Sequence, residues 1–463
     1  MKKINIAFLV IFIFGSCNKF SDSINTDTNN PNVASNMQLI TYAAFSLPDV
    51  SSSPQGEYYA QFLSETQYPN LSLYNQANFN FYGWYTGPLM NLQAVIDREK
   101  PGEDEWPVNN QMAIAKILKA YFFWHLTDRW GDLPYDDALR GKENFTPGYN
   151  TQQEIYDKLF ALLKEAADQI SGADITGDIV YEGDMEKWKK LANTIRLLMA
   201  LRLSEVDPDR GADEFNDALN AGIMTSNSDN LVYRHLAEAQ NQNYWFDQIA
   251  NQGRYWWALS ETLVEHMKPV EDPRLAVYGD PNTVGEYVGL EYGLTDDLDQ
   301  QDPSLLGAAI WEQDAPVYLV TYAQALFAKA EAAKRGWIPG GDAEAETNYN
   351  LAIEMSVRQW NNNSTAGLAE MMAYPEIEYN PATALEQIAT QRWVHLFMHG
   401  FEAWAEWRRT GFPALTAPQG KAVPTRQAYP NEEEFNNSAN FEEAVQRQFG
   451  GTNDLYGKVW WDE

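Results

Sequence analysis

The sequence predicts a mainly all-α fold, in which tetratricopeptide-like helical hairpins pack with additional helices and with long ordered loops. Two observations predict it. Apolar residues recur at spacings of three and four over most of the 463-residue chain, as on the buried face of a helix. Between residues 225 and 315 this pattern gives way to Asn, Gln, Asp, Gly and Pro mixed with aromatic clusters. So many rings favour ordered loops over disorder.

The first 16 residues are predicted to be a lipoprotein signal peptide. Lys2 and Lys3 precede a mostly apolar run of 11 residues, 4–14, which suits a secretory signal and is too short to span a bilayer. Two small residues then precede Cys17, the only cysteine of the chain, so Cys17 is the expected lipid attachment point. The alternative is an ordinary signal peptide that is cut elsewhere and leaves Cys17 as a free thiol.

The processed chain is expected to begin with a tether and to continue as one helical domain. Residues 17–36 are rich in Ser, Asn, Asp and Thr, which is typical of a segment that lies over a surface. Residues 37–463 are expected to form the single domain. Several acyl chains on Cys17 would make residence in the membrane effectively permanent, because each buried CH₂ adds about 0.8 kcal/mol.

The charge and aromatic content of the chain restrict the classes of partner that the protein can bind. The chain carries 33 Lys and Arg against 65 Asp and Glu, a net charge of -32. Nucleic acid is excluded as a partner, since phosphate binding needs clustered basic residues. The 16 Trp and 25 Tyr of this acidic chain suit neutral ligands with flat apolar faces, such as sugars.

Helices are predicted in order along the chain. The first runs over 113–130 and ends at the turn Gly131-Asp132-Leu133-Pro134. Thr151 and Glu154 form a capping box before a helix that extends to about residue 170. A further helix starts near Trp188 and is expected to end before Pro208.

Hairpin packing is predicted in the second half of the chain. An Ala-rich helix over 322–335 is followed by a Gly-rich break at 336–341 and a helix over 343–360. Small side chains on the first of these helices allow close approach of its partner, as in tetratricopeptide-like hairpins, although no strict 34-residue repeat is present. The last long helical region is expected over 381–409.

Aromatic residues in the loop region 225–315 are the ligand-binding candidates. A sugar ring presents an apolar face and a rim of hydroxyls, so recognition needs a flat ring beside polar side chains. The alternative is that these rings belong to the core, and we expect two or three of the six to touch ligand. The candidates are Trp245, Trp256, Trp257, Tyr287, Tyr292 and Trp311, with Asn243 and Arg254 as polar neighbours.

Several stretches in one order resemble a known family. They are Ile24-Asn25-Thr26-Asp27, Asn29-Asn30-Pro31, Thr127-Asp128-Arg129-Trp130-Gly131-Asp132-Leu133-Pro134-Tyr135, Asp272-Pro273-Arg274-Leu275, Phe327-Ala328-Lys329-Ala330-Glu331-Ala332-Ala333, Gln391-Arg392-Trp393, Gly400-Phe401-Glu402-Ala403-Trp404, Trp407-Arg408-Arg409-Thr410-Gly411 and Val459-Trp460-Trp461-Asp462. With these stretches the chain resembles SusD/RagB-type (SusD-like) nutrient-binding outer-membrane lipoproteins of Bacteroidetes.

The resemblance implies a non-catalytic lipoprotein on the outer membrane, facing the cell exterior. Members of that family sit as a lid on a SusC-like TonB-dependent barrel and deliver an oligosaccharide or, in some cases, a peptide. Surface lipoproteins of these bacteria often carry acidic residues directly after the lipidated cysteine. Here four residues intervene before Asp22, so outward exposure is inferred from the family alone.

The sequence gives little sign of catalysis or of a metal. No Gly-x-Ser-x-Gly, His-Glu-x-x-His or Walker-type loop is present. His395 and His399 are four residues apart without an intervening Glu, and the resemblance places them on a structural helix. No cofactor is expected, but a structural Ca²⁺ near an acidic cluster remains open. That cluster consists of Asp296, Asp297, Asp299 and Asp302.

Other aromatic and basic residues are assigned to the core, and other functions remain open. Trp84, Tyr85, Trp404 and Trp407 are expected to pack in the body, while Arg408 and Arg409 pair with buried acids or carbonyls. The alternatives to an oligosaccharide-binding protein are a peptide-binding protein of the same type, a helical scaffold lipoprotein and a surface glycoside hydrolase.

Overall fold

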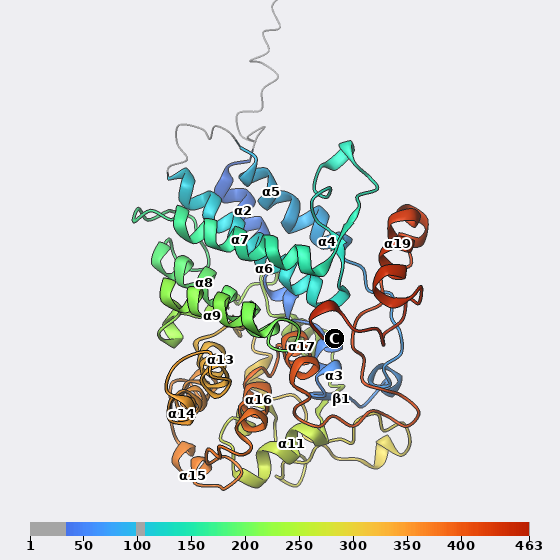
Figure 1. The fold of residues 1–463 in the computed structure, drawn as a ribbon. Coiled ribbons are helices and arrows are strands. Elements are labelled where there is room, and N and C mark those ends of the chain that lie inside the picture. The colour runs from blue at the N-terminus through green and yellow to red at the C-terminus, as the bar shows by residue number, and fades with distance from the viewer. Residues whose placement is uncertain (1–33, 99–106, 463) are drawn as a thin grey trace, which may run out of the picture.

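The computed structural model describes residues 34–98 and 107–462 (Figure 1). Cys17, the signal peptide and most of the predicted tether therefore lie outside the described residues. The described chain is mainly helical and its strands form only two-stranded sheets, which confirms the predicted fold class. Within the described ranges, no helix combines the length and apolar character needed to cross a membrane.

The helices and strands follow one another with these bounds. The helices are α2 (Asn36–Ala44), α3 (Pro54–Tyr59), α4 (Tyr82–Trp84), α5 (Met90–Ile96), α6 (Val108–Trp130), α7 (Gln152–Gln169), α8 (Met185–Arg202), α9 (Pro208–Ala221), α10 (Tyr244–Phe246), α11 (Glu261–Met267), α12 (Leu275–Tyr278), α13 (Tyr322–Lys334), α14 (Gly341–Trp360), α15 (Leu368–Met372), α16 (Ala384–His395), α17 (Gly400–Thr410), α18 (Glu433–Asn436) and α19 (Ser438–Phe449). The strands are β1 (Leu63–Glu65), β2 (Leu133–Pro134), β3 (Tyr149–Asn150), β4 (Leu231–Tyr233), β5 (Trp257–Leu259) and β6 (Val317–Val320).

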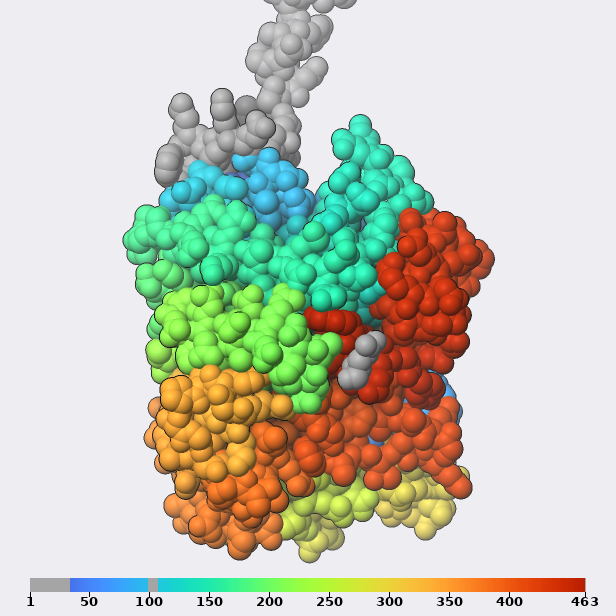
Figure 2. All heavy atoms as spheres, viewed as in Figure 1, coloured from blue at the N-terminus to red at the C-terminus, as the bar shows by residue number. Residues whose placement is uncertain are grey.

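Three helical hairpins form the body of the molecule. The pairs α6–α7, α8–α9 and α13–α14 each pack as neighbours, and contacts between α7 and α8 and between α8 and α13 join the pairs. Figure 1 shows these pairs one below another, from α7 at the top to α14 at the bottom. The space-filling view shows the same order as layers on one face (Figure 2). The α13–α14 pair confirms the hairpin that the sequence predicts over 322–360.

Local signals in the sequence set the ends of these helices. The Thr151 hydroxyl accepts a hydrogen bond from the Glu154 N–H, and the Glu154 side chain accepts one from the Thr151 N–H, which confirms the capping box. Gly131 ends α6 with φ +86°, a conformation that favours glycine. Asp207 caps α9 and Pro208 opens it, so the residues expected to end one helix also begin the next.

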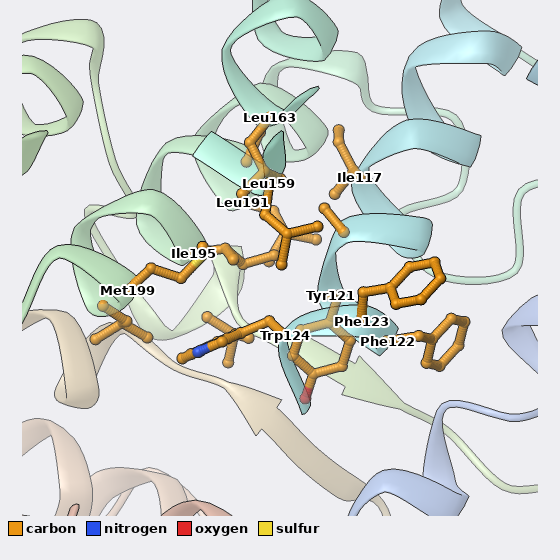
Figure 3. Packing of buried hydrophobic residues seen from close by; sticks show 14 of the residues in the cluster. Ile117, Tyr121, Phe122, Phe123, Trp124, Leu159, Leu163, Leu191, Ile195 and Met199 are labelled. Atoms are coloured by element: carbon orange, nitrogen blue, oxygen red, sulfur yellow. The ribbon is translucent and has the colours of Figure 1, made fainter. Parts of the chain in front are cut away.

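The largest core lies between the first two hairpins. Side chains from α6, α7 and α8 meet there, including Tyr121, Trp124, Leu159 and Ile195 (Figure 3). A second core joins α3, the loop region, α16 and α17, and a third lies between α13, α14 and α15. Burial of this apolar surface is the main stabilising contribution to the fold.

One predicted element differs from the structure. The sequence predicts a long helical region over 381–409, and the structure divides it into α16 and α17, which are separated at residues 396–399. Met398 lies at the break with φ +63°. The break brings Gly400 against the backbone of Gly56, so that α3 and α17 pack closely. This close approach is a tertiary requirement that helical periodicity does not show.

A buried ionic cluster connects the first core to α16 and α17. Arg202 pairs with Asp128 at 3.1 Å and with Glu402 at 2.7 Å. Arg409 pairs with Glu331 at 2.6 Å and with Glu406 at 2.7 Å. Because each of these guanidinium groups meets carboxylates, the cost of burying its charge is largely offset.

The core residues that the sequence indicated in this region are confirmed. Trp404 is fully buried, and the Arg408 guanidinium lies 3.8 Å from the centre of its ring. Arg408 also donates to the backbone carbonyls of Asp128 and Thr425. Arg409 pairs with buried acids, as expected.

The loop region 225–315 is ordered and lies against the helical body. Strand β5 pairs antiparallel with β1, and β4 pairs antiparallel with β6. These two short sheets tie the loops to segments that are distant in the sequence. The loops are thus held in place beside the C-terminal end of α14, where a pocket opens.

Candidate functional site

The principal candidate site is a pocket of about 620 Å³, which we call the loop pocket. A volume of this size lies within the range of small-molecule sites in proteins. It forms where the loop region meets the C-terminal end of α14 and the break between α16 and α17. Its walls are Ser51, Ser52, Asn243, Trp245, Pro273, Ala276, Val277, Ala309, Ile310, Glu312, Ala315, Pro316, Val317, Tyr318, Gln359, Trp360, Asn361, Asn362, Ala366, Phe397 and Met398.

Four aromatic rings line the loop pocket. Trp360 is half-buried, and its ring centre lies 5.4 Å from that of Tyr318 and 6.2 Å from that of Phe397. The Trp360 indole N–H donates to the His395 carbonyl at 3.3 Å, which fixes the ring. Trp245 is buried and packs edge-on against Trp257 at 5.1 Å. The pocket therefore offers rigid apolar surfaces of the kind that sugar rings stack on.

Amide side chains supply the polar part of the pocket. Gln359, Asn361 and Asn362 follow one another at the end of α14. The Asn361 Oδ1 atom is buried and has no hydrogen-bond partner among the described residues. A buried acceptor without a partner is costly, so a ligand hydroxyl or N–H, or an ordered water, would stabilise this atom.

Asn243 has a positioning role. Its Oδ1 accepts from the Trp245 N–H at 2.8 Å, and its Nδ2 donates to the Ala315 carbonyl at 3.1 Å. Its own N–H donates to the Gln313 carbonyl at 2.9 Å. Asn243 therefore holds two loops of the pocket together, and both atoms of its amide are already engaged.

Two aromatic pairs lie on segments next to the loop pocket, and we call them together the aromatic rim. Segment 308–316 joins the two, because Ile310 and Glu312 line the pocket and Trp311 stands between them on the rim. The residues of the aromatic rim are Tyr68, Arg254, Tyr255, Trp256 and Trp311.

The rings of the aromatic rim pack edge-on in pairs. Tyr255 is 55% exposed and meets Trp311 at 6.3 Å, while Tyr68 is 51% exposed and meets Trp256 at 4.9 Å. The Arg254 guanidinium lies 5.1 Å from the Trp256 ring centre and also bonds to the Gln248 side chain. The rim thus presents aromatic surface with an attached cation to solvent.

The candidates from the sequence fall into three places. Trp245 and Asn243 line the loop pocket, and Arg254, Trp256 and Trp311 form part of the aromatic rim. Trp257 and Tyr292 are 4% and 8% exposed in the second core. Tyr287 is half-buried at the edge of that core, where burial raises its pKa.

The chemistry of the loop pocket favours an uncharged ligand. Glu312 is the one charged residue in its wall. Within the described residues, no group of three or more His, Cys, Asp or Glu side chains could hold a metal ion.

His395 bonds the Thr321 hydroxyl at 2.7 Å and the Ser356 hydroxyl at 2.9 Å. Both of its ring nitrogens are therefore engaged with hydroxyl groups.

Sequence reasoning missed Trp360, Tyr318 and Phe397. A signal was present at the end of α14, where Trp360 stands among Gln359, Asn361 and two further asparagines. Asn362 and Asn363 take positive φ values there, which asparagine tolerates, and this turns the chain into the pocket wall. An aromatic residue beside amides is the same pattern that marks the ligand-binding candidates in residues 225–315.

Comparisons with known proteins agree on one family. A family model described as "Starch-binding associating with outer membrane" (SusD-like) matches residues 28–430. A solved structure described as a chitin-binding protein is 30% identical, and the match covers 92% of this chain and 99% of that one with a TM-score of 0.82. No curated protein gives a significant match.

Two further solved structures share the fold. A SusD homolog from Bacteroides fragilis is 26% identical, with 93% of this chain and 100% of that chain covered and a TM-score of 0.79. A chitin-binding SusD homolog from Flavobacterium johnsoniae is 23% identical, with 92% and 99% covered and a TM-score of 0.76. At that identity the last comparison is evidence for the fold alone.

Proposed function

The chain belongs to the SusD-like family, and on this premise we propose that it is a non-catalytic surface protein that captures a neutral oligosaccharide. The ligand enters the loop pocket and lies across the aromatic rim. The observation that carries the proposal is the wall of Trp245, Tyr318, Trp360 and Phe397 beside a row of amides, with a single charge. Rings and amides together match the apolar faces and polar edges of a sugar.

An N-acetylated oligosaccharide of the chitin type is the proposed ligand class. One similar structure, at 30% identity, is described as chitin-binding. The amides of Gln359, Asn361 and Asn362 can exchange hydrogen bonds with acetamido groups, and Ala276, Ala309 and Ala366 leave apolar space for their methyl groups. Starch-type oligosaccharides lack these groups and are the natural comparison.

Delivery to a transporter completes the proposed function. The predicted lipid on Cys17 would hold the protein on the outer membrane, where it would pass its ligand to a SusC-like TonB-dependent barrel. A modest affinity suits such a step, since a ligand that is bound too tightly would not leave. A dissociation constant near 1 mM corresponds to about 4 kcal/mol and 1 μM to about 8 kcal/mol.

The test compares variants of the pocket and the rim. Tyr255→Ala removes an exposed ring of the rim and is expected to weaken chitooligosaccharide binding by about 0.5–1.5 kcal/mol. Ala366→Trp places a large ring at the pocket wall from an exposed position and is expected to abolish binding. Isothermal titration calorimetry measures both changes.

The matched control is Tyr42→Ala. Tyr42 is 57% exposed on α2 and lines neither the loop pocket nor the aromatic rim. Tyr42→Ala is expected to bind like the wild type. Unchanged binding in both Tyr255→Ala and Ala366→Trp, with normal melting temperatures, would place the ligand elsewhere and contradict the proposal.

A further inference from the structure

A second pocket, of about 350 Å³, lies apart from the loop pocket, and we call it the Arg129 pocket. The turn 46–53 separates the two: Ser51 and Ser52 face the loop pocket, whereas Ser46 and Asp49 face the Arg129 pocket. Phe79, Trp84 and Phe401 supply aromatic surface to its wall. Trp84 is half-buried, and its ring packs on Phe122 at 5.3 Å.

Arg129 is a buried cation without an acidic partner. Its side chain is 7% exposed, and among the described residues no carboxylate forms an ion pair with it. Its Nε donates to the Gln427 Oε1 at 2.6 Å, and its Nη1 lies 3.0 Å from the His125 Nε2. The guanidinium also lies 3.9 Å from the centre of the Phe401 ring. All of these partners are neutral or aromatic.

The neighbouring groups leave the Arg129 charge uncompensated. Burial, and the charge of Arg129 itself, hold the pKa of His125 well below its usual range, so His125 is neutral. Burial lowers the pKa of Arg129 to about 9, so the guanidinium keeps its charge at neutral pH. Two other buried arginines, Arg202 and Arg409, differ because each meets carboxylates.

This arrangement is unusual for an acidic protein. The chain has 65 acidic residues, yet none of the described ones pairs with Arg129. An unpaired buried charge is costly unless something compensates it. The Arg129 Nη2 makes no hydrogen bond to a described residue and is not sealed from solvent, and the side chain lines the pocket. A donor therefore remains available to a ligand.

We propose that the Arg129 pocket binds the carboxylate of an acidic sugar unit, with the Arg129 guanidinium as donor and the Trp84 ring as the surface beneath the sugar. The inference rests on the proposed oligosaccharide binding and adds a second subsite, which extends the ligands of the protein from neutral oligosaccharides to those that carry an acidic unit. Charge-assisted hydrogen bonds between guanidinium and carboxylate are about twice as strong as neutral ones, so this subsite selects by charge. Asp49 faces the same pocket and opposes an anion there.

The experiment compares a galacturonic acid trisaccharide with its methyl ester, which keeps the shape and removes the charge. Calorimetry on the wild type is expected to give at least tenfold tighter binding of the acid. Asp49→Asn removes the opposing carboxylate and is expected to tighten binding of the acid severalfold. Equal affinities for acid and ester in the wild type would overturn the proposal.

Two variants test whether the acidic sugar binds in the Arg129 pocket. Arg129→Gln is expected to abolish the preference for the acid, and retention of the preference would overturn the proposal. Arg129 packs on core rings, so Arg129→Gln also changes the core. A second variant therefore keeps Arg129 and fills the Arg129 pocket instead. A Cβ on Gly83, in the pocket wall, would meet no atom within 4 Å, so Gly83→Phe can fill the pocket without strain.

Gly87→Phe is the matched control. Gly87 has the same open surroundings one helical turn later and does not line the Arg129 pocket. Gly83→Phe is expected to lose the acid and Gly87→Phe to keep it; loss in both or in neither would contradict the assignment. Chitooligosaccharide binding at the loop pocket serves as a separate readout, so failure of this subsite and failure of the proposed function are distinguishable.

Discussion

Asn243 and Asn361 are residues of one type with two roles. Asn243 uses both atoms of its amide to join loops, whereas Asn361 leaves a buried oxygen without a partner among the described residues. Two aromatic residues of the loop region also differ in what they can contact. Trp257 is 4% exposed in the core, whereas Tyr255 is 55% exposed. Neighbouring residues in the fold, more than residue type, decide which side chain can meet a ligand.

The raised pKa of the buried Glu57 carboxyl predicts that the stability of the protein depends on pH. It is fully buried, its Oε1 accepts from the Gly400 N–H at 2.9 Å, and burial raises its pKa from 4.5 to about 8. Between these values the folded state holds a proton that the unfolded state has lost, so unfolding releases one proton. The free energy of unfolding therefore falls by about 1.4 kcal/mol per pH unit as the pH rises through this window.

Glu57→Gln removes this titration and isolates its effect. Urea denaturation is expected to show a variant that gains stability over the wild type steadily from about pH 5 to pH 8. Glu434→Gln changes an exposed glutamate and is expected to follow the wild-type curve. A constant difference between Glu57→Gln and the wild type across this range would show that Glu57 titrates normally.

At the scale of elements, the close packing of α3 against α17 accounts for the break between α16 and α17, which the sequence did not indicate. A Cβ on Gly400 would overlap the backbone of Gly56 and Glu57. Gly400→Ala is therefore expected to destabilise the protein by about 1–3 kcal/mol, because neither backbone can move away cheaply. A denaturant titration measures this loss.

A second glycine serves as the control for this junction. A Cβ on Gly87 meets nothing within 4 Å, and Gly87→Ala is expected to change stability by less than about 1 kcal/mol, in the stabilising direction. Equal effects of Gly400→Ala and Gly87→Ala would mean that the close approach of α3 and α17 is not required.

The helices with strong local signals could be predicted from the sequence, and the site could be predicted only in part. The capping box at Thr151 and the glycine at Gly131 set helix ends by local chemistry, and both are where the sequence placed them. Trp360 and Phe397 reach the loop pocket through tertiary packing of α14 and of the α16–α17 break. No local pattern indicates that these residues come together, so three of the four aromatic residues of the wall were not predicted.

At the scale of the whole molecule, membrane attachment remains a prediction from the first 17 residues. Mass spectrometry of the protein from its native membrane is expected to show acyl chains on Cys17, because the apolar run and the small residues before it suit a lipoprotein signal. Cys17→Ser is expected to release the protein from the membrane fraction. An unmodified thiol in the native protein would contradict this prediction.

The molecule as a whole combines a helical body with the proposed ligand face, which is built on loops. The hairpins hold α14 in place, and the sheets β1–β5 and β4–β6 hold the loops against it, so the pocket is formed before a ligand arrives. A preformed site loses little entropy on binding. This would let the proposed site bind sugars through the few contacts that the aromatic rim offers.

Calorimetric titration of the wild-type protein with chitooligosaccharides, maltooligosaccharides and peptides tests the central claim most directly. The account predicts saturable binding of a neutral oligosaccharide, strongest for the N-acetylated series, with no release of reducing ends. Binding of peptides alone, or cleavage of the oligosaccharide during the titration, would contradict it.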